Sequence, residues 1–149
     1  MPLVLDASVA LSWIFADERT AESRAIADAV LDEDAIVPAL WRWEIQNALV
    51  VGQRRGRITD EASAAALTYL AALPIEVESV GPALIFGSEK ETAKRFNLSA
   101  YDAAYIELAL RRGTRIATLD GNLARTAEAL KIRWEPPVAR PARKRRKTR

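Results

Sequence analysis

Short apolar runs alternate along the chain with longer stretches in which apolar residues recur at helical spacing. The compact apolar runs at 2–5, 35–38 and 115–119 are typical of buried parallel strands. Residues 75–80 alternate apolar and polar positions, which predicts a strand near a sheet edge with one solvent-facing side. A final strand is a candidate at 132–134. The intervening stretches predict helices at about 8–16, 20–32, 40–55, 59–73, 82–96, 99–112 and 121–131.

This order of strands and helices predicts an α/β fold, a sandwich in which helices flank a parallel sheet of four or five strands. A chain of 149 residues fits a single domain. In parallel sheets of this kind, ligands bind at the carboxyl ends of the strands, where the strand order reverses. Acidic residues at those ends are therefore the first candidates for chemistry.

The composition narrows that chemistry, because the chain contains neither cysteine nor histidine. Disulfide frameworks, thiolate nucleophiles, Cys/His zinc sites and Ser-His-Asp triads are thereby excluded. The apolar runs fall short of the ~20 residues of a membrane span, and no signal-peptide pattern opens the sequence. We expect a cytoplasmic protein that does not interact with membranes.

Charge is distributed unevenly along the sequence. Residues 139–149 hold seven basic side chains and no acid, while residues 1–138 hold 15 basic and 20 acidic side chains. A basic run of this kind repels itself, so we expect one domain at 1–137 and a basic, disordered tail at 138–149. The tail serves either as a solubility appendage or as an attractor of nucleic acid.

Four carboxylates stand out because the pattern places them among apolar neighbours. Asp6 and Asp120 end two apolar strands, whereas Glu44 and Asp102 lie on the apolar faces of two helices. Each alone is explained as a helix cap or a satisfied core carboxylate. Together they predict one pocket, and a cluster of four negative charges needs cations. Oxygen ligands favour Mg²⁺ or Mn²⁺.

Four short motifs carry a resemblance to a known family. The segments LVLDAS (3–8), WEIQNAL (43–49), LSAYDAAY (98–105) and ATLD (117–120) resemble those of PIN-domain ribonucleases of the VapC toxin type, in the family's order and spacing over residues 2–134. The resemblance implies a PIN-like fold and a Mg²⁺- or Mn²⁺-dependent endoribonuclease that hydrolyses RNA. It also implies a homodimer that is held inactive by a cognate antitoxin.

Carried over to this sequence, the family's acidic quartet falls on the same four residues: Asp6, Glu44, Asp102 and Asp120. We assign the central metal to Asp6 and Asp102, with Glu44 and Asp120 completing its shell, binding a second ion or orienting water. The resemblance makes Ser8 and Thr118 supporting hydroxyls, with Asn122 as a further candidate. The basic tail has no counterpart in the family pattern.

An acidic pocket repels RNA, so basic side chains at its rim must contact phosphate. The candidates are Arg54, Arg55, Arg57, Arg111, Arg112 and Arg115. Two alternatives to a toxin stay open: a housekeeping RNA-processing nuclease and a non-catalytic PIN module that binds nucleic acid. Aspartyl-phosphate chemistry is disfavoured, because Ser8 stands where haloacid-dehalogenase-like phosphatases carry a second acid.

Overall fold

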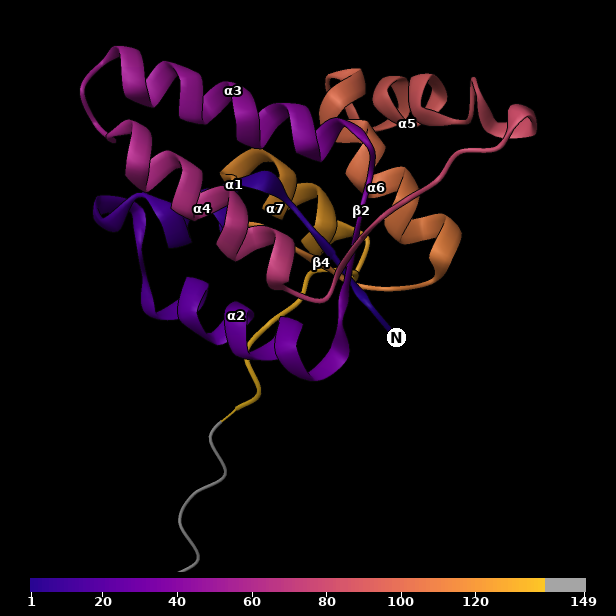
Figure 1. The fold of residues 1–149 in the computed structure, drawn as a ribbon. Coiled ribbons are helices and arrows are strands. Elements are labelled where there is room, and N and C mark those ends of the chain that lie inside the picture. Colours follow the sequence, from indigo (N-terminus) through magenta and orange to yellow (C-terminus); the bar gives the residue numbers. More distant parts are fainter. Residues whose placement is uncertain (139–149) are drawn as a thin grey trace, which may run out of the picture.

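Four short parallel strands form the centre of the molecule in the computed structural model, which describes residues 1–138 (Figure 1). The strands pair in the order β3-β2-β1-β4. Their bounds are β1 (Leu3–Leu5), β2 (Ala35–Val37), β3 (Ile75–Val77) and β4 (Ile116–Ala117). The predicted α/β sandwich is thus confirmed, with the smaller of the two expected strand numbers. The expected basic tail lies almost wholly outside the described residues.

Helices flank the sheet. They are α1 (Ala7–Ile14), α2 (Ala21–Glu33), α3 (Leu40–Arg54), α4 (Asp60–Ala72), α5 (Glu89–Phe96), α6 (Ala100–Arg112) and α7 (Gly121–Ala129), with 3-10 turns η1 (Ala16–Glu18) and η2 (Pro82–Leu84). The hydroxyls of Thr20, Thr59 and Ser99 accept backbone N–H groups at the starts of α2, α4 and α6. These starts agree with the boundaries that the sequence predicts, since hydroxyl caps satisfy otherwise unpaired helix donors.

Two predicted elements differ from the structure. The expected helix at 82–96 is helical only from Glu89, after the short turn η2. Pro82 opens that turn, and Gly87 interrupts the segment because glycine stabilises a helix poorly. The candidate strand at 132–134 is reduced to an isolated parallel bridge between Ile116 and Arg133.

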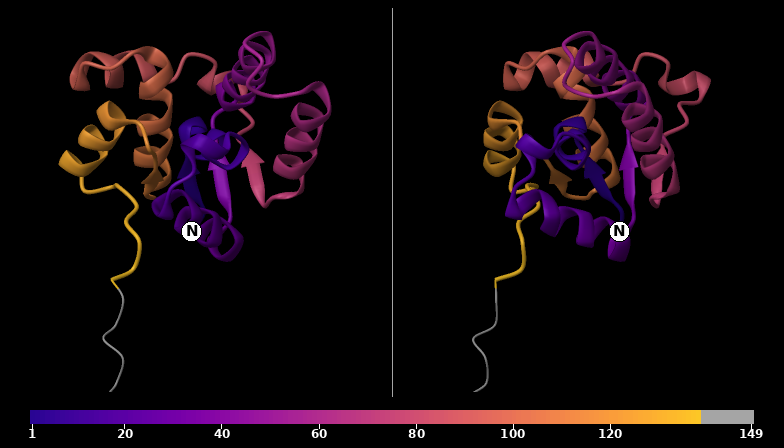
Figure 2. Two further views of the ribbon diagram at one scale, coloured as in Figure 1. Left: turned by 90° about the vertical axis from the view of Figure 1, so that its left-hand side faces the viewer. Right: turned by 60° about the vertical axis from the view of Figure 1, so that its left-hand side comes forward.

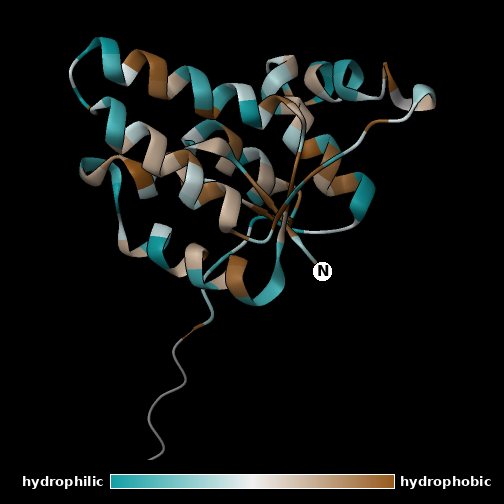
Figure 3. Cartoon of the chain, in the orientation of Figure 1, coloured by the Kyte–Doolittle hydropathy of each residue, from teal (hydrophilic) through white to brown (hydrophobic). Residues whose placement is uncertain are grey.

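The apolar core lies between the strands and the inner faces of the helices. All residues of β1, β2 and β4 are buried, and Tyr105, Ile106 and Leu108 of α6 are fully buried against the sheet. The strands are correspondingly hydrophobic in Figure 3, whereas helices show polar outer faces. β3 is only partly buried and lies at the edge, as its alternating pattern predicts. Within residues 1–138, every helix is too short or too polar to cross a bilayer.

The strand order reverses between β1 and β4. β2 lies next to β1 and β3 lies next to β2 on one side of the sheet, whereas β4 lies on the other side of β1. The Asp6 N–H donates to the Ala117 carbonyl oxygen (3.0 Å), so the carboxyl ends of these two strands lie together. This is the position at which open α/β sheets bind ligands.

Candidate active site

Asp6 follows β1 and is the most deeply buried of the predicted site acids, with 5% of its surface exposed. Its Oδ2 accepts hydrogen bonds from the hydroxyls of Ser8 (2.5 Å) and Thr118 (2.8 Å). Asp6 occupies the N-cap position of α1, but its carboxylate makes no capping hydrogen bond and is held by these two hydroxyls instead. Both bonds fall on Oδ2, and no hydrogen bond from a side chain of the described residues reaches Oδ1.

Asp120 lies across the strand reversal, at the start of α7. Its Oδ1 accepts the Leu123 N–H (2.8 Å), and its own N–H donates to the Thr118 hydroxyl oxygen (3.0 Å). The Ser8 hydroxyl oxygen accepts the Leu119 N–H (3.0 Å). The two hydroxyls therefore join the β1–α1 turn to the β4–α7 turn and fix the separation of their acids. An open cleft of about 730 Å³ lies beside Ser8 and Asp120.

Glu44 and Asp102 project from α3 and α6, and both are half-buried. The Tyr105 hydroxyl donates to Glu44 Oε1 (2.8 Å), which joins α6 to α3. Asp102 stands in the first turn of α6, where its N–H donates to the Ser99 hydroxyl (3.1 Å). The sequence pattern places both acids on apolar helix faces, and their partial burial agrees with that prediction.

Electrostatic coupling links the four acids. Burial raises the pKa of Asp6, which the hydrogen bonds from Ser8 and Thr118 oppose, and the charges of Asp120 and Asp102 raise it further. Burial likewise raises the pKa of Glu44, opposed by the Tyr105 bond and reinforced by Asp6 and Asp102. The pKa of Asp102 is raised by burial and then by Asp120. The carboxylates thus destabilise one another's charge and attract cations.

The donor set suits a hard divalent ion. The side-chain atoms that could bind a metal ion at the site are carboxylate and hydroxyl oxygens, the ligand type that Mg²⁺ and Mn²⁺ prefer. Within residues 1–138, no three acidic side chains are positioned to hold one ion between them. Mg²⁺ commonly uses one or two carboxylates and keeps several waters, so the residues present fit such an ion.

The predicted RNA-binding arginines do not gather at this site. Arg57 pairs with Asp17 (3.0 Å) and Glu18 (3.2 Å), and its guanidinium lies 4.3 Å from the centre of the Phe15 ring. Arg115 pairs with Glu33 (2.7 Å). These two arginines are thus engaged by acidic side chains of the same chain.

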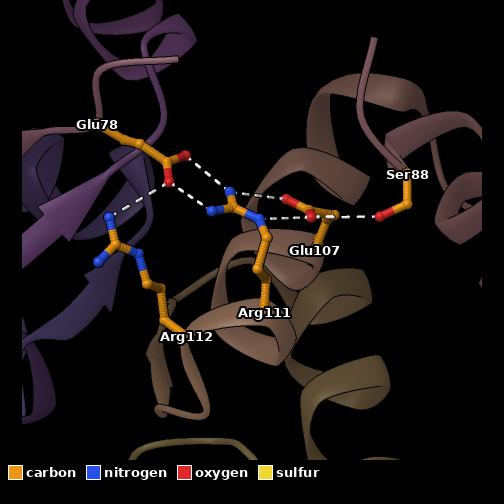
Figure 4. A network of polar contacts seen from close by, with 5 residues as sticks. All are labelled: Glu78, Ser88, Glu107, Arg111 and Arg112. Atoms are coloured by element: carbon orange, nitrogen blue, oxygen red, sulfur yellow. Dashed lines mark hydrogen bonds and ion pairs between the residues drawn. The ribbon is translucent and has the colours of Figure 1, made fainter. Parts of the chain in front are cut away.

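Arg111 and Arg112 belong to a separate polar network (Figure 4). Arg111 binds Glu78 (2.7 Å) and Glu107 (2.8 Å), and Arg112 lies 3.5 Å from Glu78. Of the other predicted residues, Arg54 and Arg55 are exposed at the end of α3, and Asn122 is exposed on α7. The structure thus brings the acids and hydroxyls together and leaves the arginines dispersed.

Tyr105 is a site residue that the sequence pattern does not single out. Its ring is fully buried, while its hydroxyl donates to Glu44 on α3. The available signal was a tyrosine three residues after Asp102 on the apolar face of a helix, since a buried tyrosine hydroxyl needs a polar partner. That partner could not be identified from sequence spacing.

Comparison with known proteins bears on the family and the fold. The sequence matches the family model described as PIN domain over residues 3–129. The fold is similar to the crystal structure of PAE2754 from Pyrobaculum aerophilum, with a TM-score of 0.65, 22% sequence identity and 86% of each chain covered. At this identity the likeness shows the fold alone. No curated protein is similar enough to the sequence to match it.

Proposed function

The chain belongs to the PIN domain family, and from that membership we propose that it is an endoribonuclease dependent on Mg²⁺ or Mn²⁺. PIN domains are generally metal-dependent nucleases that act on nucleic acids. The observation that carries the proposal is the buried Asp6 carboxylate, held by Ser8 and Thr118 at the strand reversal. Glu44, Asp102 and Asp120 lie close enough to form one electrostatic unit with it.

In this proposal Asp6 and Asp102 hold the ion, and Glu44 and Asp120 complete its surroundings. A bound divalent ion lowers the pKa of a coordinated water and stabilises negative charge on phosphoryl oxygens. Ser8 and Thr118 keep Asp6 in one orientation through their hydrogen bonds. Glu44 has a raised pKa and is positioned by Tyr105, which suits it to accept a proton from water in a chain without histidine.

The test is cleavage of single-stranded RNA by purified protein in Mg²⁺ or Mn²⁺. We expect cleavage that stops on addition of EDTA and that falls at least 100-fold in Asp102→Asn, because the acids act as a unit. The matched control is Asp32→Asn, which neutralises an exposed acid on α2 and should cleave like the wild type. Cleavage that survives EDTA, or equal loss in both variants, would contradict the proposal.

We further propose that the enzyme is the toxin of a toxin–antitoxin pair and acts as a homodimer. The support is the set of four motifs in register with VapC-type ribonucleases. Induced expression of the wild type should arrest growth, whereas Asp102→Asn should not. Co-expression of the cognate antitoxin, which toxins of this type have encoded beside them, should restore growth. Normal growth under wild-type induction would favour a housekeeping nuclease, and sedimentation of a pure monomer would contradict the homodimer.

A further inference from the structure

Two large aromatic side chains next to the site acids are exposed to solvent. Trp43 directly precedes Glu44 on α3 and is 67% exposed, and Tyr101 directly precedes Asp102 on α6 and is 72% exposed. The same two helices bury Trp41 and Tyr105. Packing within the described chain therefore explains the buried pair of aromatic residues but not the exposed pair.

The exposed pair lies on two helices that meet at the site. The bond between Tyr105 and Glu44 joins α3 to α6, and Tyr101 stands one turn before Tyr105 on the same side of α6. Figure 2 shows the strands pointing toward the end of the molecule where α3 and α6 begin. Trp43 and Tyr101 therefore stand on the two helices that carry Glu44 and Asp102, in the turns that hold these acids.

The charge of the site favours a binding role for these two exposed aromatic residues. Four carboxylates repel a phosphate backbone, and Arg57, Arg111 and Arg115 are paired with acidic side chains of the same chain. Interactions that do not depend on charge would therefore add affinity for a nucleic acid that reaches the acids. Stacking of bases on aromatic rings is such an interaction and contributes about 1–3 kcal/mol per base.

We propose that Trp43 and Tyr101 form a stacking platform for unpaired bases next to the scissile phosphate. The inference rests on the proposed nuclease function and identifies the residues that would hold the bases of its RNA substrate. Bases can lie against a protein ring only when they are unpaired and splayed from their neighbours. A duplex, whose bases are stacked on one another, is therefore a poor ligand for this surface.

Binding of a short single-stranded oligoribonucleotide tests the platform independently of cleavage. The measurement is the Kd by fluorescence anisotropy in the Asp102→Asn background. We expect Trp43→Ala and Tyr101→Ala each to weaken binding about 5- to 150-fold, the range that corresponds to one lost stacking contact. Trp43→Phe and Tyr101→Phe keep a ring and should retain most of the affinity. Phe86→Ala removes a 95% exposed aromatic residue and should leave the Kd unchanged.

In the active protein, the same alanine changes should raise KM and leave kcat close to the wild-type value. An oligonucleotide with abasic positions beside the cut should bind weakly to the wild type and lose nothing further in Trp43→Ala. An unchanged Kd in both alanine variants would overturn the platform, even if the protein cleaves RNA. A dimer that becomes a monomer in Trp43→Ala, with RNA affinity intact, would identify the pair as a subunit contact instead. A protein that binds RNA without cleaving it would refute the nuclease and retain the platform.

Discussion

Tyr105 links two helices through its hydroxyl group. The ring is fully buried on α6, and the hydroxyl donates to Glu44 on α3. Burial raises the pKa of Tyr105, and the charges of Asp6 and Glu44 raise it further, so the phenol stays protonated and donates. We therefore regard Tyr105 as a positioning residue for the Glu44 carboxylate.

Replacing Tyr105 with phenylalanine removes the hydroxyl and keeps the ring. We expect kcat for RNA cleavage to fall about 10- to 100-fold, the usual cost of losing an outer partner of a metal ligand. The Mn²⁺ concentration for half-maximal rate should rise, whereas KM for RNA should change little. Steady-state kinetics across a Mn²⁺ series measures all three quantities, and a melting curve establishes that the variant is folded.

Tyr69→Phe is the matched control, because Tyr69 is a half-exposed tyrosine on α4 outside the acidic cluster. It should behave like the wild type in the same kinetic series. A Tyr105→Phe protein with wild-type kcat and wild-type Mn²⁺ dependence would show that the hydroxyl only stabilises the fold.

Single residues differ in how far the sequence predicts their surroundings. Asp6 and Asp120 are predictable because a parallel sheet brings the ends of neighbouring strands together. The ion pairs of Arg57 with Asp17 and of Arg115 with Glu33 are not, since their partners are distant in sequence and no spacing rule joins them. The RNA-binding role of these arginines stays a prediction.

Among the secondary-structure elements, the edge strand β3 is tied to α6 by ionic contacts. Glu78 follows β3 and is 8% exposed, and it receives two hydrogen bonds from Arg111 (2.7 and 2.9 Å), which also binds Glu107 (Figure 4). The hydrogen bonds from Arg111, with its positive charge, hold the pKa of Glu78 below its ordinary value. A carboxyl with a lowered folded-state pKa stabilises the fold at neutral pH and loses that effect on acidification.

Glu78→Gln should lower the free energy of unfolding by about 1.5–3 kcal/mol at pH 7, the range for hydrogen bonds to charged groups. The difference from wild type should shrink as the pH falls through the lowered pKa of Glu78. Urea unfolding at pH 7 and at about pH 3 measures both values. Glu76→Gln changes the exposed neighbour on β3 and should have little effect at either pH. A loss in Glu78→Gln that is equal at both pH values would contradict an ionic contribution.

The sequence predicts most element boundaries because helix starts carry local signals. Thr20, Thr59 and Ser99 are such signals, and each caps a helix in the structure. In the segment before α5, the apolar residues do not recur at one clear spacing. Ile85 and Phe86, which would suit the buried face of a helix, are exposed there. Pro82 and Gly87, which disfavour a continuous helix, account for the shorter helix in this segment.

At the scale of the whole molecule, mutual repulsion among the site acids opposes folding. The charge of Asp120 raises the pKa of Asp6 and Asp102, so the folded state holds their protons more tightly than the unfolded chain does. The stability that comes from this tighter proton binding is lost as the pH rises through the raised pKa values of Asp6 and Asp102. At neutral pH the repulsion among the acids lowers the stability of the folded state by its full amount. Removal of one charge should therefore restore part of that stability.

Asp120→Asn should therefore raise the melting temperature in EDTA at pH 7. An asparagine retains the cap on α7, and relief on the order of 0.5–1 kcal/mol corresponds to a few degrees for a chain of this length. The gain should shrink near pH 3, because the raised pKa values of Asp6 and Asp102 favour the neutral form of these two carboxyls there. Scanning calorimetry at both pH values measures it. A variant that melts below the wild type in EDTA at pH 7 would show that these acids do not repel one another.

Direct binding of Mn²⁺ tests the central claim, that the acids at the strand reversal form the centre of a metal-dependent nuclease. The measurement is free Mn²⁺ by electron paramagnetic resonance during titration of the protein in the absence of RNA. We expect saturable binding to the wild type and to Asp32→Asn, with affinity at least 10-fold weaker in Asp6→Asn. Equal Mn²⁺ affinity in Asp6→Asn and the wild type would contradict a metal centre at these acids.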